Sequence, residues 1–368
     1  MPEPADPRAL VDDLVAAEAG DWDLAGAVPD GVLRRLGAAG LLCPQVDGRY
    51  GGLGRDSRWT GEFTAHLGSR CGSVRSVLTS QSMAAGTIAR LGDAAQRHEH
   101  LTRLTSGALA AAAFSEPGAG SDLSAMTTEV RRDGDGVVLT GHKTWITAAA
   151  YADLVVVVAR QDDGAAAVVV PADAPGVVVT PVVAPSGCRA AGHADVRLDG
   201  VRLPASAVLG GGGQPLPLLV TAALQHGRMS VAWGCVGILR SCLTEASRHA
   251  ATREQFGVPL AEHQLVARHL AELLVAERSA THACEHAADA VDARSPDQVV
   301  AAVLAKHTAA TLAARGAASA VQVLGSAAAR DGHPVARAHR DAKLMEIIEG
   351  TSEICQLILA RHAVAAAR

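Results

Sequence analysis

Two short polar segments near the middle of the chain carry side chains that could hold a flat organic ligand. The first, residues 115–122, reads Ser-Glu-Pro-Gly-Ala-Gly-Ser-Asp. Because its proline and glycines propagate neither a helix nor a central strand, we expect a loop lined by small hydroxyl and amide groups. The second segment carries Trp145 and Thr147 two places apart, so on a strand both side chains would share one face. A flat aromatic ring beside a hydroxyl donor suits a flat ring system edged with heteroatoms.

Other clusters of reactive side chains lack the spacing that their chemistry requires. His98-Glu99-His100 could suggest a metal, but residue 102 is a threonine, so the His-Glu-x-x-His pattern is absent. Residues 68–72 place a serine in the wrong position for a nucleophile elbow. Glycine-rich residues 48–54 lack the Gly-Lys-Ser/Thr ending of a phosphate loop. None of these clusters therefore predicts a site of its own, and we predict no metal site.

The composition indicates a large core of small apolar side chains. Of the 368 residues, 49% are hydrophobic but only 2% are aromatic, which favours closely packed helices rich in Ala, Val and Leu. A net charge of −5 without a basic stripe argues against a nucleic-acid partner. No apolar run reaches membrane-spanning length, residues 1–13 show no secretory signal, and the seven cysteines are widely scattered. We expect a cytoplasmic protein with reduced, buried thiols and no membrane partner.

Helical apolar spacing marks both ends of the chain. In residues 8–110, Val11 and Val15 share one helical face, and Pro29-Asp30 has the chemistry of a helix start. After the glycine linker at 210–213, apolar faces recur in four segments: 216–247, 263–289, 298–324 and 344–364. Both ends should therefore be helical.

Short β-branched runs fill the region between them. They predict strands at 137–140, 154–159, 166–170, 176–183 and 195–198. Turn signals at 133–136 and 162–164 predict hairpins, and no long helices separate the runs, so a parallel Rossmann sheet is not expected. The fold class is α+β. Its expected parts are an N-terminal helical domain (1–110), a middle antiparallel β-sheet or barrel domain (111–209) and a C-terminal four-helix bundle (210–368).

Five segments, in order, resemble the signatures of the acyl-CoA dehydrogenase flavoprotein family, and the resemblance extends over nearly the whole chain. They are 115–122, 145–147, 253–257 with Gln264 following at the expected spacing, 322–326 and 349–353. The resemblance implies the helical–sheet–helical fold, an FAD cofactor and the removal of two hydrogens from an acyl thioester. It also implies that the segments around Arg253 and 322–326 reach the FAD of a neighbouring subunit, hence a homodimer or homotetramer.

The family pattern assigns residues to the cofactor and the substrate. In the family, the tryptophan of the second segment flanks the isoalloxazine ring and the threonine bonds near flavin N5. The implied FAD-binding residues are Phe114, Ser115, Gly120, Ser121, Trp145, Ile146, Thr147, Arg253, Phe256, Gln264, Gln322, Val323, Gly325, Thr351 and Glu353. The implied substrate-binding residues are Ser121, Arg228, Ile348 and Gly350. Plainer alternatives are a core role for Trp145, a solvated charge at Arg253 and a structural ion pair at Arg228.

The implied reaction needs a base for the α-proton while a β-hydride leaves for flavin N5. Such a proton is weakly acidic, so the base is expected to be a carboxylate in a dry pocket, where its pKa rises toward the operating pH. By resemblance this catalytic base is Glu349, which we expect on a loop or helix end before Gly350, and its backbone N–H helps to hold the thioester carbonyl. Glu346 and Glu353 are alternative bases, and Glu349 could instead cap a helix. Some family members carry the base on the helix that here holds Gly227, which has no side chain.

Three departures from the family pattern bear on the substrate. Ile348 stands where many members have tyrosine, neutral Gln225 replaces an acid near the pantetheine arm, and Ala327-Ala328 replace glycine. With the short chain, these features resemble the acyl-carrier-protein-linked branch that makes alkoxymalonyl (methoxymalonyl) extender units for polyketides. That branch implies a small hydroxylated acyl thioester on a carrier protein. Alternatives are a conventional short-chain acyl-CoA dehydrogenase that reduces an electron-transfer flavoprotein, a non-catalytic flavoprotein scaffold, and an oxidase.

Overall fold

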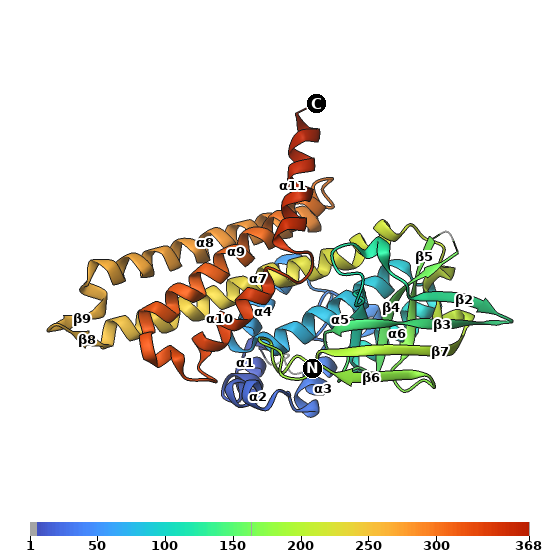
Figure 1. The fold of residues 1–368 in the computed structure, drawn as a ribbon, viewed down its shortest axis with the longest axis horizontal. Coiled ribbons are helices and arrows are strands. Elements are labelled where there is room, and N and C mark those ends of the chain that lie inside the picture. The colour runs from blue at the N-terminus through green and yellow to red at the C-terminus, as the bar shows by residue number, and fades with distance from the viewer. Residues whose placement is uncertain (1–5, 163, 368) are drawn as a thin grey trace.

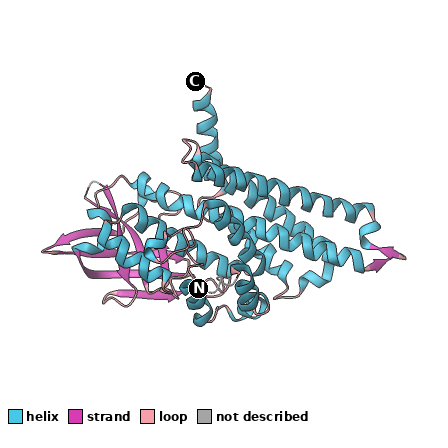
Figure 2. Cartoon of the chain, turned by 180° about the vertical axis from the view of Figure 1, so that it is seen from behind, coloured by secondary structure: helices cyan, strands magenta, loops and turns pink. Residues whose placement is uncertain are grey.

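A helical region, a sheet and a second helical region follow one another along the chain in the computed structural model, which describes residues 6–162 and 164–367 (Figure 1). Two sequence predictions fall partly outside the described residues. These are the absence of a secretory signal, which concerns residues 1–5, and the turn at 162–164, which includes Asp163. Figure 2 shows the large sheet at one end of the molecule, long helices extending from it, and a small two-stranded hairpin at the far end of those helices.

The N-terminal region consists of short helices packed around one buried helix, α5. Its elements are α1 (Pro7–Val11), η1 (Asp12–Ala16), α2 (Ala19–Ala25), α3 (Asp30–Ala38), η2 (Gly48–Tyr50), α4 (Ser57–Arg70), α5 (Gly72–Leu91) and α6 (Ala94–Thr105). Val11 and Val15 are fully buried, as their spacing predicts, and Pro29 directly precedes α3. In α5, residues 73–88 are all buried, because the helix packs against α4, α6, α7 and β1.

The middle region is one sheet in which four of the six strand pairings are antiparallel. The strands are β1 (Ala110–Ala113), β2 (Glu129–Asp133), β3 (Gly136–Ile146), β4 (Leu154–Gln161), β5 (Gly164–Pro171), β6 (Val177–Pro181) and β7 (Ala194–Pro204), followed by η4 (Ala205–Ala207) and η5 (Leu209–Gly211). All five predicted strands are present. β1 and β2 were not predicted because four alanines and the sequence Glu-Val-Arg-Arg-Asp carry little β propensity. Each forms a parallel pairing with β4.

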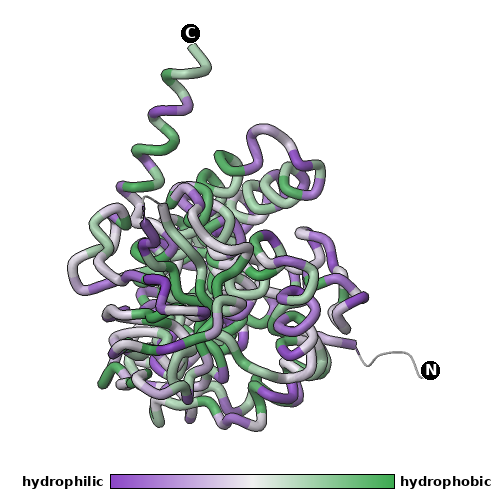
Figure 3. Tube along the Cα trace, turned by 90° about the vertical axis from the view of Figure 1, so that its right-hand side faces the viewer, coloured by the Kyte–Doolittle hydropathy of each residue, from purple (hydrophilic) through white to green (hydrophobic). Residues whose placement is uncertain are grey.

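The C-terminal region contains the expected bundle. Its elements are α7 (Leu216–Thr252), the β8–β9 hairpin (Glu254–Gln255 and Val258–Pro259), η6 (Leu260–Glu262), α8 (Gln264–Asp292), α9 (Gln298–Leu324), η7 (Gly325–Ala329), α10 (Pro334–Met345) and α11 (Ser352–Ala366). Helices α7–α10 pack through buried alanines, and at Gly316 an added methyl group would meet Leu239 at 2.6 Å. Helix α11 stands out from the body, with its C-terminal end away from the bundle (Figures 1 and 3).

The helical segment predicted over 344–364 is divided between two helices, and the expected place of Glu349 on a loop or helix end is confirmed. Helix α10 ends at Met345 and α11 begins at Ser352, and between them Glu349 and Gly350 have φ angles of 55° and 94°. Only left-handed backbone gives such angles, and this conformation ends a right-handed helix.

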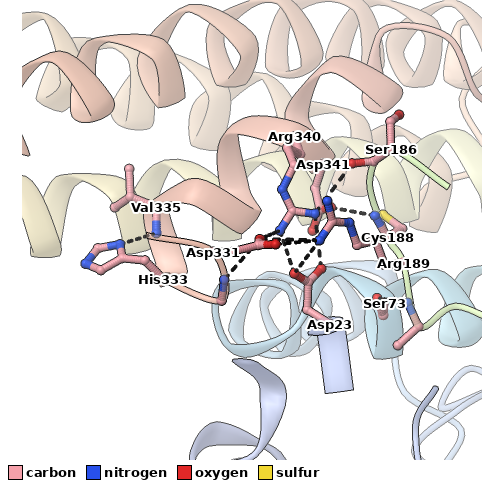
Figure 4. Close-up of polar contacts among 12 residues, drawn as sticks. Asp23, Ser73, Ser186, Cys188, Arg189, Asp331, His333, Val335, Arg340 and Asp341 are labelled. Atoms are coloured by element: carbon pink, nitrogen blue, oxygen red, sulfur yellow. Dashed lines mark hydrogen bonds and ion pairs between the residues drawn. The ribbon is translucent and has the colours of Figure 1, made fainter. Parts of the chain in front are cut away.

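Polar contacts join the three regions at the side of α10 (Figure 4). Arg340 of α10 contacts the Asp23 carboxylate of α2 at 3.3 Å, and the next residue, Asp341, accepts a hydrogen bond from the backbone N–H of Cys188 at 2.5 Å. Arg189 contacts Asp331 at 3.1 Å. Because α10 leads directly to Glu349, these contacts help to fix the position of that residue relative to the sheet.

Candidate active site

A bulge at the end of β3 positions the two side chains singled out for a flat ligand. Between Lys143 and Ile146 the pairing with β7 shifts register, and Trp145 has a φ of 56°. The Asp195 carboxylate holds this bulge by accepting hydrogen bonds from the Thr144 hydroxyl (2.6 Å) and the Trp145 N–H (3.2 Å). The expectation that Trp145 and Thr147 alternate on a regular strand is therefore wrong, since Thr147 follows the strand.

Trp145 and Thr147 nevertheless converge on one side chain, His193. The Thr147 hydroxyl lies 3.2 Å from His193 Nδ1, and the indole and imidazole ring centroids are 5.9 Å apart. Burial and the charge of Arg75 lower the pKa of His193 to about 4, so the ring is neutral near neutral pH. Its buried Nε2 has no hydrogen-bond partner among the described residues.

The loop over 114–122 is held by a buried ion pair. Lys143 Nζ donates to Glu116 at 2.9 Å and to the backbone carbonyl of Phe114 at 2.9 Å. The Glu116 carboxylate also accepts from the Thr127 and Thr128 backbone N–H groups, at 2.7 and 3.0 Å. Burial alone would raise the pKa of Glu116, but these hydrogen bonds and Lys143 bring it down to about 2. The loop is thus fixed at its root while Gly120 and Ser121 remain exposed.

Glu349 lies on the other side of the candidate site, in the turn between α10 and α11. Its carboxylate fills the space beside Gly227 of α7, where an added methyl group would lie 2.3 Å from Oε2 and 2.9 Å from Met83 Sδ. Burial raises the pKa of the carboxyl group, and the nearby cations Arg228, Lys306 and Arg75 partly offset this rise. A side chain at residue 227 would therefore collide with the expected base.

Two buried cations hold the backbone of the turn that carries Glu349. Lys306 of α9, which is fully buried, donates from Nζ to the Gly350 carbonyl at 2.6 Å. Arg228 of α7 donates from Nε to the Glu349 carbonyl at 3.3 Å. Arg228 therefore contacts the base's own residue rather than forming an ion pair with a carboxylate among the described residues. The backbone of Glu349 keeps its strained φ angle because these hydrogen bonds hold the turn in place.

The remaining site predictions fall into two spatial groups within one chain. In the first group, Phe114, Ser115, Gly120, Ser121, Ile146 and Thr147 lie on the loop and bulge beside Trp145, and Arg228, Ile348, Gly350, Thr351 and Glu353 lie on or beside the turn of Glu349. At the end of the bundle farthest from the sheet lie Arg253, Phe256, Gln264, Gln322, Val323 and Gly325 (Figure 1). Phe256 is 96% exposed there, with a φ of 54°. One chain alone does not bring the two groups together.

The residues on the sheet side fit the flavin that the resemblance implies. The Trp145 indole is 54% exposed although its neighbour Ile146 is buried, so a flat apolar face remains open. Beside it are the Thr147 hydroxyl and the neutral His193 ring, which supply hydrogen-bonding groups. At Gly118 and Gly120 an added methyl group would meet nothing within 4 Å, which leaves room for a ligand on the loop.

Sequence reasoning missed Lys306, His193 and Met83, which lie in or beside the site. None belongs to a recognised local motif, because each reaches the site through tertiary packing. One signal was available for Lys306, since a lone lysine inside the apolar helical segment 298–324 indicates a buried charge.

Replacing Lys143 by methionine should destabilise the protein by about 3 kcal/mol, because it leaves the buried Glu116 carboxylate without its counter-ion. Urea unfolding measures this loss. Exposed Lys343, replaced by methionine, is the control and should change stability by less than about 0.5 kcal/mol. The ionised Glu116 carboxylate contributes to the free energy of unfolding above the ordinary carboxyl pKa of 4.5, and this contribution is lost as the pH falls toward 2. Equal losses in the two variants at pH 7 would contradict the assignment.

Comparison with known proteins identifies the same three regions along the chain. Sequence models of the acyl-CoA dehydrogenase N-terminal, middle and C-terminal domains match residues 5–108, 111–201 and 218–364. The probable acyl-CoA dehydrogenase YngJ of Bacillus subtilis (strain 168) is 34% identical over 356 residues, which are 95% of this chain and 93% of the relative.

Solved structures show the same similarity. The structure of FkbI, described as serving biosynthesis of the methoxymalonyl extender unit of the Fk520 polyketide, has a TM-score of 0.94 and 61% identity, covering 98% of this chain and 99% of FkbI. A glutaryl-CoA dehydrogenase from Mycobacterium smegmatis, solved in complex with FADH2, has a TM-score of 0.91 and 28% identity, covering 98% and 92% of the two chains. The chain therefore belongs to the acyl-CoA dehydrogenase family and is an FAD-dependent oxidoreductase that acts on CH–CH groups.

Proposed function

We propose that this enzyme oxidises a small, hydroxylated acyl thioester carried by an acyl carrier protein, in the synthesis of a polyketide extender unit. The supporting observation is the 61% identity to FkbI over 98% of the chain, against 34% to YngJ. Two features of the site agree with a substrate unlike a fatty acyl-CoA. Ile348 packs against the bundle core without a hydroxyl group, and Gln225 bonds to Gln298 at 3.0 Å instead of presenting a carboxylate.

We assign the α-proton abstraction to Glu349. Its carboxylate lies among apolar and small groups beside Gly227 and Met83, where burial raises its pKa and makes it a stronger base than an exposed carboxylate. Lys306 and Arg228 hold the turn, so that the Glu349 backbone N–H can face the thioester carbonyl as a hydrogen-bond donor. Bound FAD supplies the hydride acceptor. Trp145 and Thr147 would hold the ring system of the FAD. The fixed loop over 114–122 would contact the side of the cofactor.

We further propose that the active form is a homodimer or homotetramer. The cofactor residues Arg253, Phe256, Gln264 and 322–325 lie far from Trp145 in the same chain (Figure 1). Phe256 and Leu265 are 96% and 75% exposed, as expected for side chains that meet a second copy. Each FAD site would then combine the sheet side of one chain with the bundle end of another.

Three further assignments concern the domain boundaries, the location and the electron acceptor. We propose domain boundaries at 1–110, 111–209 and 210–368, a cytoplasmic location, and an electron-transfer flavoprotein as electron acceptor. Among the described residues, no helix is long and apolar enough to cross a membrane, and the seven cysteines are unpaired and buried. A conventional short-chain acyl-CoA dehydrogenase is the second candidate, favoured by the 32% identity over 341 residues to the mitochondrial short-chain specific acyl-CoA dehydrogenase of Homo sapiens. A non-catalytic scaffold would have no need of a buried carboxylate in a strained turn.

The substrate proposal predicts a higher kcat/KM for a hydroxyacyl group on acyl carrier protein than for butyryl-CoA, by at least about tenfold. Steady-state kinetics measures both values. The same hydroxyacyl group on CoA is the control that separates the effect of the carrier from that of the acyl group. A preference for butyryl-CoA would contradict the proposal and favour the conventional dehydrogenase.

The pH dependence of flavin reduction reports on Glu349. The base accepts a proton only when ionised, so the rate should rise with pH through a pKa above the ordinary 4.5, because burial raises it. Lys306→Met removes a cation that lowers this pKa, and should shift the midpoint of the profile to higher pH. Lys343→Met is the matched control on α10, and should leave the midpoint unchanged. A shift to lower pH in Lys306→Met would refute the electrostatic assignment.

The shared cofactor site predicts complementation between two defective chains. Arg253→Gln and Thr147→Ala should each weaken FAD binding, by about tenfold, because each removes a contact to the same bound group. Mixed oligomers of the two variants should recover some sites of near-normal affinity, measured by FAD titration. Sedimentation gives the oligomeric state in the same samples. A fully FAD-loaded monomer would rule out shared sites.

A further inference from the structure

His193, which directly precedes β7, has one ring nitrogen in use and one enclosed without a partner. Its Nδ1 lies 3.2 Å from the Thr147 hydroxyl oxygen. The buried Nε2 has no hydrogen-bond partner among the described residues, and no carboxylate oxygen of these residues lies within 4.0 Å of either ring nitrogen. Burial and the charge of Arg75 lower the pKa of His193 to about 4, so near neutral pH the ring carries a single proton.

Two other histidines of the fold have partners that decide which ring nitrogen holds the proton. His333 Nδ1 accepts from the Val335 N–H at 3.1 Å, and His263 Nε2 lies 3.1 Å from the Gln255 carbonyl oxygen, to which it must donate. His193 contacts only a hydroxyl group, which can donate or accept. The tautomer of this ring therefore determines how the Thr147 hydroxyl is used.

Backbone hydrogen bonds hold both members of the pair. The Thr147 carbonyl accepts from the Ser80 hydroxyl of α5 at 2.9 Å, and the His193 carbonyl accepts from the Val182 N–H at 2.9 Å. The Trp145 indole packs on the imidazole ring, with 5.9 Å between the ring centroids. The two side chains are thus kept together, and the hydroxyl hydrogen of Thr147 is the part left free to turn.

The enclosed Nε2 favours the tautomer with the proton on Nδ1. With the proton on Nε2, the ring would bury an N–H donor without an acceptor, and orphaned buried N–H groups are rarer in folded proteins than acceptors short of a donor. With the proton on Nδ1, the ring buries only a lone pair, and Nδ1 donates to the Thr147 oxygen. The Thr147 hydroxyl hydrogen then points away from His193 and is available to a ligand.

We propose that His193 is a positioning residue that acts through Thr147, donating from Nδ1 to the hydroxyl oxygen so that the hydroxyl hydrogen points at an acceptor atom of the bound FAD. The inference rests on the proposed contact of Thr147 with the flavin ring system. Flavin N5 accepts a hydrogen bond when oxidised and carries a hydrogen when reduced. A donor fixed beside it favours the oxidised cofactor, so His193 should lower the reduction potential of bound FAD.

The tautomer can be measured in the unaltered, FAD-loaded protein by NMR of isotopically labelled histidine side chains. The His193 signals are identified by their loss in His193→Asn. They should show the proton on Nδ1 and a neutral ring at pH 7. A proton on Nε2 would overturn the proposal, because Thr147 would then donate to the ring and not to the cofactor.

The reduction potential, measured at saturating FAD, tests the consequence. His193→Leu frees the Thr147 oxygen, so the affinity for reduced relative to oxidised FAD should rise about tenfold, which raises a two-electron potential by about 30 mV. His193→Asn, whose amide N–H can replace Nδ1–H, should change this ratio by less than about threefold. Exposed His339→Leu is the control and should leave the potential unchanged. An unchanged or lower potential in His193→Leu would overturn the proposal.

A Thr147→Val background separates this inference from the cofactor assignment. There His193→Leu should no longer shift the potential, because the hydroxyl through which it acts is gone. An equal shift in both backgrounds would overturn the proposal, since His193 would then act without Thr147. If Thr147→Val alone changes neither the FAD affinity nor the potential, the placement of Thr147 beside the flavin fails, and the inference fails with it. If Thr147→Val shifts the potential and His193→Leu does not, the inference alone fails.

Discussion

The structure depends on a short break between two helices in which a carboxylate is buried next to a strained backbone. Glu349 occupies left-handed backbone, which costs a non-glycine residue about 1–2 kcal/mol. Its side chain also leaves water, which raises the pKa of the carboxyl group. Lys306 and Arg228 hold the backbone of the turn from two other helices, and Gly227 leaves room for the carboxylate. The bundle thus keeps a strong base at a fixed place.

The sheet side of the site uses a similar device. Trp145 is also held in left-handed backbone, here by the Asp195 carboxylate across the bulge, and its ring stays exposed although the next residue, Ile146, is buried. The buried Glu116–Lys143 pair fixes the root of the neighbouring loop. Both sides place one functional residue in a conformation that it would not adopt alone. The contacts of Arg340 and Asp341 connect the sides through α10 (Figure 4).

Much of the fold could be predicted because its signals are local. Apolar spacing predicted α9 with both ends correct, and the turn signal at 133–136 predicted the turn that joins β2 to β3, although β2 itself was not predicted as a strand. The apolar spacing of 344–364 did not indicate the α10–α11 break, which only the family motif suggested at Glu349, because apolar residues lie on both sides of it. The left-handed angle at Glu349 comes from tertiary contacts. Family motifs drew attention to Trp145, Thr147 and Glu349. They could not indicate His193, Lys306 or Met83, which lie outside those motifs and reach the site through tertiary packing.

The most direct test of the central claim is anaerobic titration of the FAD-loaded protein with a short hydroxyacyl thioester, following flavin absorbance. The account predicts that the wild type bleaches and that Glu349→Gln, which keeps the shape of the side chain but cannot take the proton, binds the thioester without bleaching. Bleaching of both proteins at similar rates would contradict the account, because the base would then be a group other than Glu349.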